Sequence, residues 1–194
     1  CAYPAIMAAL DAETPESTII TVLADKEEIG SDGNTGLNSS FMNYFIADLA
    51  QAECLETRHV LSKTKCLSAD VAAAFDPTFA SVYEPTNSCY INNGVGMSKY
   101  TGSRGKSGSS EASAEFVAEI RNIFNENNVL WQIGELGKVD EGGGGTVALY
   151  IANLNVDVLD VGVPVLSMHE PFEVVSKLDI YMTYKGIKAF YQAK

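Results

Sequence analysis

The chain has 194 residues, a formal net charge of −12 at pH 7 and an ordinary hydrophobic content of 46%. This length suits one domain with a substantial core. The negative charge argues against nucleic acid or an anionic membrane as a partner, and no apolar run approaches the length of a transmembrane helix. Four cysteines without a C-x-x-C pair indicate a reducing, cytoplasmic setting.

Helical and strand-like patterns alternate along the whole chain. Helices are predicted at residues 4–10, from residues 35–38 onward, at 111–125, at 146–153 and at 172–192. Strands are predicted at residues 18–24, 66–71, 129–133 and 156–162, with a short extended run at 164–168 and a polar loop at 100–110. This order favours an α/β fold with a mainly parallel mixed sheet flanked by helices on both faces.

Two of these helices are expected to be amphipathic. The helix that opens at residues 35–38 would carry its apolar side chains on one face, namely Phe41, Phe45, Ile46 and Leu49. The helix at 111–125 would bury a second stripe, made of Phe116, Ile120, Ile123 and Phe124.

An acidic turn, Asp25 to Gly33, follows the predicted strand at 18–24 directly. In open α/β sheets this carboxyl end of a strand is where ligand sites form. Adjacent Glu27 and Glu28 repel each other unless a cation binds one of them or a proton stays on one. A divalent metal on one glutamate, with the other as base for a metal-bound water, resolves the conflict. For the pair taken alone, a solvated acidic turn is the plainer alternative.

Asp70 and His169 end two other apolar runs, so they are expected near the same edge of the sheet. With Glu28 they supply two carboxylates and an imidazole, a set suited to Zn²⁺ or another first-row metal. Each has a structural alternative: Asp70 as the N-cap of a helix at 71–75, and His169 as a turn histidine.

Four consecutive glycines, Gly142 to Gly145, precede the helix predicted at 146–153. Free N–H groups there would hold a substrate carboxylate or a peptide carbonyl. The run lacks the G-x-G-x-x-G spacing of a dinucleotide site. There is also no G-x-S-x-G motif and no cysteine beside a histidine, so nucleophilic catalysis has no support.

Taken in order, five segments resemble the aspartyl aminopeptidase / vacuolar aminopeptidase I family of binuclear zinc metallopeptidases. They are Asp25-Lys26-Glu27-Glu28-Ile29-Gly30-Ser31, Ser68-Ala69-Asp70-Val71-Ala72, Gly94–Lys99, Gly143-Gly144-Gly145-Thr146, and Leu166-Ser167-Met168-His169 with Pro171 and Glu173. The resemblance covers essentially the whole chain and implies the αβα sandwich of the zinc exopeptidases.

The resemblance also implies a role for each matching position. Glu27 would be the general base, Glu28 and His169 would bind one metal, and Asp70 would bind the other. The cofactors would be two divalent ions, zinc first, with cobalt or manganese as alternatives. Lys99 would contact a peptide substrate, and the pocket would be lined by Gly144, Gly145 and Thr146. The family also implies a homo-oligomer.

The chain departs from the family in three respects. Family members carry a His-x-Asp motif and a metal-bridging aspartate upstream of the segment that resembles Cys1-Ala2-Tyr3-Pro4. Residues 1–194 are therefore expected to be the C-terminal portion of a catalytic domain, without the upstream ligands or the inserted domain, and inactive alone. Ala73 replaces a usual histidine, and Glu170 replaces a small residue. The alternative is a non-catalytic relative or fragment with an assembly or peptide-binding role.

Overall fold

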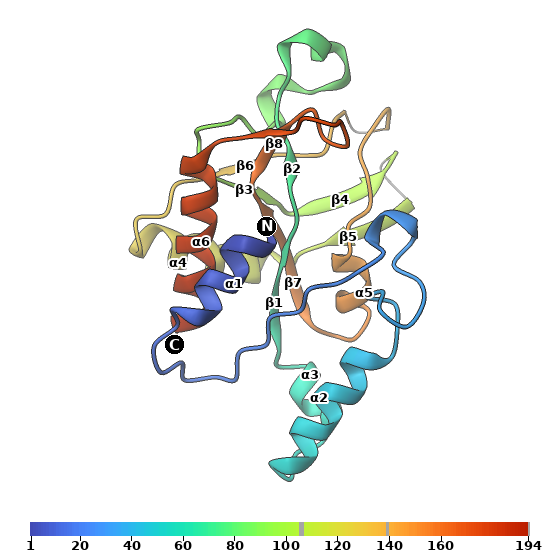
Figure 1. The fold of residues 1–194 in the computed structure, drawn as a ribbon, viewed down its shortest axis with the longest axis vertical. Helices are drawn as coiled ribbons and strands as arrows, with labels where there is room; N and C mark the ends of the chain where they lie inside the picture. Colours follow the sequence, from blue (N-terminus) through green and yellow to red (C-terminus); the bar gives the residue numbers. More distant parts are fainter. Residues whose placement is uncertain (105–106, 139, 194) are drawn as a thin grey trace.

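The computed structural model describes residues 1–104, 107–138 and 140–193 and has a four-stranded sheet at its centre (Figure 1). The spatial order is β1 (Lys65–Ala69), β7 (Asp157–Gly162), β3 (Val95–Ser98) and β6 (Trp131–Ile133). β1 runs parallel to β7 and β3 parallel to β6, while β7 and β3 are antiparallel. The prediction of a mainly parallel mixed sheet is confirmed.

Helices cover both faces of this sheet, as predicted (Figure 1). On one face α1 (Ala2–Leu10), α4 (Ala114–Glu126) and α6 (Lys177–Gln192) pack on side chains such as Leu67, Leu159 and Val161. On the other face α5 (Ala148–Ala152) packs near Cys66 and Val158, together with residues of α2 (Phe41–Ala52) and α3 (Thr57–Leu61). Because side chains alternate along a strand, even-numbered residues of β1 and β7 face α5.

The short strands extend this frame. β2 (Ala72–Ala73) pairs in parallel with β8 (Pro164–Leu166), which also pairs with β9 (Val174–Val175). β4 (Tyr100–Ser103) and β5 (Ser107–Glu111) form an antiparallel hairpin, so the polar loop predicted at 100–110 is wrong in the described residues. Backbone ladders form whatever the side-chain polarity, and this hairpin is built from serine, threonine and glycine. Residues 105 and 106 lie outside the described part.

Helix boundaries and burial differ from the prediction in several places. The helix expected to open at residues 35–38 begins at Phe41, and the one expected from residue 111 begins at Ala114. α4 buries the predicted stripe of Phe116, Ile120, Ile123 and Phe124, and Ser113 caps its first turn. α6 begins at Lys177 rather than at residue 172, because the Ser176 hydroxyl accepts a hydrogen bond from the N–H of Leu178 and opens the helix there. In α2 only Ile46 of the predicted face is fully buried, and Phe41 is 72% exposed.

Residues 18–24 do not form the buried strand that their apolar composition predicts. They run extended without a ladder to any described strand, and Ile20, Val22 and Leu23 are exposed. Directly after this segment, Asp25 forms an isolated β-bridge with Gly36. Apolar, β-branched residues favour a buried strand, but a segment becomes one only when another strand pairs with it. The described residues supply no such strand here.

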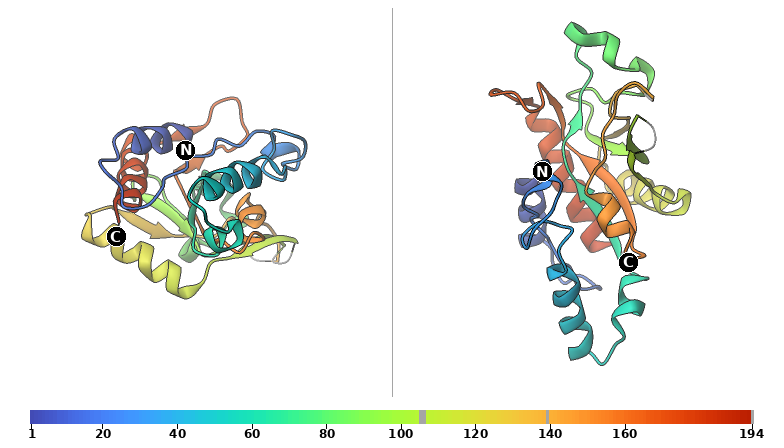
Figure 2. Two further views of the ribbon diagram at one scale, coloured as in Figure 1. Left: turned by 90° about the horizontal axis from the view of Figure 1, so that it is seen from below. Right: turned by 90° about the vertical axis from the view of Figure 1, so that its right-hand side faces the viewer.

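Two segments project from opposite ends of the molecule (Figure 2). One end carries the α2–α3 hairpin, and the other carries the short 3₁₀ turns η2 (Pro77–Val82) and η3 (Pro85–Asn87). None of the described helices is both long and apolar enough to cross a membrane.

Candidate active site

The acidic turn is held in a tight loop that presents its two glutamates side by side. Lys26 and Gly30, which flank η1 (Glu27–Ile29), both have left-handed backbone conformations, with φ of 62° and 95°. The N–H of Ser31 donates to the carbonyl of Lys26 at 2.8 Å and closes the loop. The Tyr150 hydroxyl donates to the carbonyl of Gly30 at 3.2 Å, which ties the turn to α5.

Glu28 and His169 are brought together from distant parts of the chain. The imidazole Nδ1 of His169 lies 3.7 Å from Glu28 Oε1, and both side chains are largely exposed. His169 has a left-handed φ of 68°, and its backbone N–H donates to Glu173 Oε1 at 2.7 Å. A turn fixed in this way gives the ring a defined place opposite the glutamate.

Asp70 stands where β1 and β7 reach the same edge of the sheet. Its Oδ1 accepts a hydrogen bond from the N–H of Val71 at 2.6 Å. Residues 72–73 form β2, so the alternative role of Asp70 as the cap of a helix at 71–75 is wrong. Gly162 lies directly beneath, and a Cβ at this position would lie 1.4 Å from the Asp70 carbonyl oxygen. Only glycine lets β7 approach Asp70 so closely.

The surroundings of Glu27 connect all four predicted residues. Burial raises the pKa of its carboxyl to about 7, with further contributions from the negative charges of Asp70 and Glu28 and from a hydrogen bond with Glu28. His169 acts in the opposite direction. Glu27 therefore shares one electrostatic environment with Glu28, Asp70 and His169, and a fully solvated turn does not describe it.

A metal ion would find part of its ligand set here. A catalytic zinc takes three protein ligands, commonly His with Asp or Glu. Within the described ranges, no three His, Cys, Asp or Glu side chains lie close enough to hold one ion. Glu28 and His169 form a pair, whereas the negative charge of Asp70 acts on Glu27. The side-chain donors suit a metal ion. Glu28, His169 and Asp70 alone do not complete the ligand set of either of two ions.

Beside Asp70 the surface has a shallow recess, lined in part by Ser68, Thr101, Thr146 and Asp160. A neighbouring shallow recess shares Thr101 and Leu136 with it and reaches Gly142 and Gly143.

Of the predicted substrate residues, Thr146 lines the recess beside Asp70. Space around the Cα of Gly144 is open, and Gly145 lies against the backbone of Gly108. Lys99 is ion-paired with Glu111 on β5.

Asp160, in the middle of β7, is the polar residue that sequence reasoning missed. Its Oδ1 accepts a hydrogen bond from the Ser68 hydroxyl at 2.7 Å and its Oδ2 accepts one from the Thr146 hydroxyl at 3.1 Å. Burial raises the pKa of Asp160 to about 6, against the opposing effect of the two hydrogen bonds. A carboxylate inside the apolar run at 156–162 was the available signal.

Comparison with known proteins gives consistent matches over this length. The model of the family described as "Aminopeptidase I zinc metalloprotease (M18)" matches residues 1–191. A Clostridium acetobutylicum protein named "Probable M18 family aminopeptidase 1" is 46% identical over 98% of the chain. The crystal structure of an M18 family aminopeptidase from Thermotoga maritima is 42% identical, with a TM-score of 0.95 over 99% of the chain.

A more distant structure shares the fold. The mApe1 dodecamer of Saccharomyces cerevisiae has a TM-score of 0.80 at 22% identity, over 98% of the chain and 43% of its own length. The chain spans less than half of all three proteins: 42% of the Clostridium protein and 44% of the Thermotoga chain.

Proposed function

Because the chain belongs to the M18 family of aminopeptidase I zinc metalloproteases, we propose that the protein containing it removes N-terminal residues from peptides by metal-dependent hydrolysis. The observation that carries the proposal is the shared environment of Glu27 with Glu28, Asp70 and His169 at one edge of the sheet. These are the residue types that bind a hydrolytic metal and move a proton beside it.

The residues divide into metal ligands and a base. Glu28 and His169, 3.7 Å apart, would hold one ion and Asp70 the second. Two divalent ions, zinc by the family's description, would polarise the scissile carbonyl and lower the pKa of a bound water. Further ligands are needed for both ions, so we propose that residues 1–194 act as the C-terminal portion of a larger catalytic unit.

Glu27 is suited to receive and return a proton. A carboxyl whose pKa lies near neutrality accepts a proton from water and later gives it to the leaving amine with little penalty in either direction. Thr146 and the glycines before it would line the substrate side, since Thr146 borders the recess that Asp70 enters. Lys99 would have to leave Glu111 to reach a substrate.

We extend the proposal to setting and assembly. The dodecamer of the structurally similar mApe1 supports a homo-oligomer, and the four free cysteines support a reducing, cytoplasmic location.

A non-catalytic role is favoured by one observation. Ala73 lies on β2, next to the loop that holds Asp70, where the resemblance leads one to expect a histidine. A methyl group neither donates a hydrogen bond nor carries charge, so a peptide-binding or assembly role remains the second candidate.

The decisive experiment compares two adjacent glutamates in the complete gene product. Glu27→Gln should lower peptide hydrolysis by about a hundred- to ten-thousand-fold with metal content near wild type, because an amide cannot accept the proton. Glu28→Gln and His169→Ala should lower the metal content itself, with partial recovery at excess metal. Glu119→Gln, on the exposed side of α4, is the matched control. Loss of metal from Glu27→Gln with full activity of Glu28→Gln would overturn the assignment.

A further inference from the structure

We propose that Asp160 is a positioning residue: it holds the glycine-run loop against the strand that carries Asp70. The proposal rests on the proposed function, because it assigns Asp160 the task of placing the substrate side of the site relative to the metal side. Asp160 lines the recess beside Asp70, and its proposed effect is exerted through Ser68 and Thr146.

The sheet register places Asp160 between these two parts. In the parallel ladder of β1 and β7, Ser68 stands opposite Asp160, two residues before Asp70. Both side chains point to the face covered by α5, as the alternation from Cys66 and Val158 requires. Thr146 lies just before α5 on that same face. The carboxylate of Asp160 therefore links β1 to the loop that leads into α5.

The hydrogen bonds around Asp160 have a fixed direction. An ionised carboxylate only accepts, so Ser68 and Thr146 must both donate to it. With its proton committed, Thr146 accepts from the Thr101 hydroxyl, 3.3 Å away. The chain of hydroxyls from Thr101 through Thr146 to Asp160 thus has one donor direction, and it links Thr146 to both β4 and β7.

The glycine run is open at Gly144, where a Cβ would meet no atom within 4 Å, while Gly143 and Gly145 lie against the backbone of Gly102 and Gly108. Glycines without side chains give a loop little stiffness of its own. The bond from Thr146 to Asp160 supplies a partly buried polar link at the end of the run.

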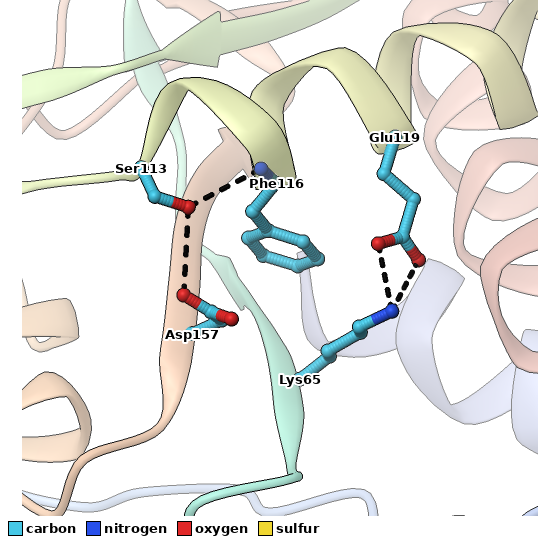
Figure 3. Close-up of polar contacts among 5 residues, drawn as sticks. All are labelled: Lys65, Ser113, Phe116, Glu119 and Asp157. Atoms are coloured by element: carbon cyan, nitrogen blue, oxygen red, sulfur yellow. Dashed lines mark hydrogen bonds and ion pairs between the residues drawn. The ribbon is translucent and has the colours of Figure 1, made fainter.

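A contribution to fold stability alone does not explain why an aspartate occupies position 160. Within the described part of the chain its hydrogen-bond partners are two hydroxyls, Ser68 and Thr146, and burial of a carboxylate beside neutral groups is costly. The same strand carries Asp157 at its exposed end, bonded to Ser113 at 3.5 Å (Figure 3). Asp157 is therefore a matched control for changes at Asp160.

The test replaces each aspartate by asparagine in the complete gene product. Asp160→Asn keeps the shape but cannot accept from both hydroxyls, so kcat/KM for a short peptide should fall by about ten- to a hundred-fold, as misplacement of about 1 Å costs. Metal content should stay at the wild-type value. Asp157→Asn should change neither quantity. Thr146→Val should reproduce the loss, and Thr146→Ser, which keeps the hydroxyl, should recover part of it.

A second measurement is independent of catalysis. Amide hydrogen exchange at residues 143–146 should become faster in Asp160→Asn and in Ser68→Ala, and should be unchanged in Asp157→Asn. If the wild-type protein hydrolyses no peptide, the proposed function fails, and the exchange data still decide whether Asp160 anchors the loop. Unchanged exchange in both variants, or loss of metal from Asp160→Asn in step with activity, would overturn the positioning role.

Discussion

The two ends of the β1–β7 strand pair carry similar polar residues in very different surroundings. The ladder pairs Lys65 with Asp157 at one end and Ser68 with Asp160 three residues later. At the first end, Lys65 donates to both carboxylate oxygens of Glu119 at 2.7 Å (Figure 3). These side chains are exposed, and solvent competes for every bond they make.

The polar residues toward the carboxyl end of the same pair are less exposed than Lys65 and Asp157. Ser68 is 6% exposed and reaches Asp160 at 2.7 Å, and the carbonyl of Asp70 rests on Gly162. Electrostatic effects grow where water is excluded, so a bond that contributes little at one end constrains the structure at the other. The two ends of the strand pair therefore differ mainly in how far water reaches their polar side chains.

The largest effect is expected from Gly162→Ala. The added methyl would lie 1.4 Å from the carbonyl oxygen of Asp70, so the backbone of one strand must move. We expect a loss of about 1–3 kcal/mol in the free energy of unfolding, measured by urea denaturation, and weaker metal retention. Gly144→Ala, with open space at its Cα, should stay within about 0.5 kcal/mol. Equal stability of both variants would show that the carboxyl end is not closely packed.

An effect of similar or smaller size is expected from pH. The folded pKa of Asp160 is about 6, above its ordinary 3.8, so the folded state binds the proton more tightly. This contribution to stability is complete below about pH 4 and is lost as pH rises through about 6. Relative to Asp160→Asn, the metal-free wild type should therefore lose up to about 3 kcal/mol across this window. A constant difference between the two proteins would contradict the burial of this carboxylate.

The smallest effect is expected at the exposed end. Lys65→Met removes the ion pair with Glu119, and both side chains are more than a third exposed. The free energy of unfolding should change by about 1 kcal/mol or less, and that change should shrink in about 1 M NaCl. A loss as large as that of Gly162→Ala would erase the contrast between the two ends.

Local patterns predicted the parts of the fold that depend on one segment. The stripe of α4 was correct, because a helical period of apolar residues can be satisfied by one covered face. The four motif residues were expected at one edge because parallel strands end together. The structure brings Glu27, Glu28, Asp70 and His169 into one environment, although the segment before Glu27 is not a strand. Their catalytic and metal-binding roles stay predictions.

Features that depend on contact with another segment could not be predicted from the sequence. Residues 18–24 have strand composition but no neighbour among the described strands, so their burial could not follow from composition. The β4–β5 hairpin has few apolar residues to reveal it. The contacts of Asp160 could not be predicted from the sequence, because they depend on the strand pairing with Ser68 and on the approach of Thr146.

The central place of β7 has a consequence for how the chain folds. β7 lies between β1 and β3, and the bond from Ser68 to Asp160 joins residues 92 positions apart. During synthesis β1 and β3 leave the ribosome long before the strand that separates them, so their edges stay unpaired until residues 157–162 arrive. Such non-local pairing slows folding and exposes strand edges to other nascent chains. The strand that carries Asp160 is thus also the one that ends this period of exposure.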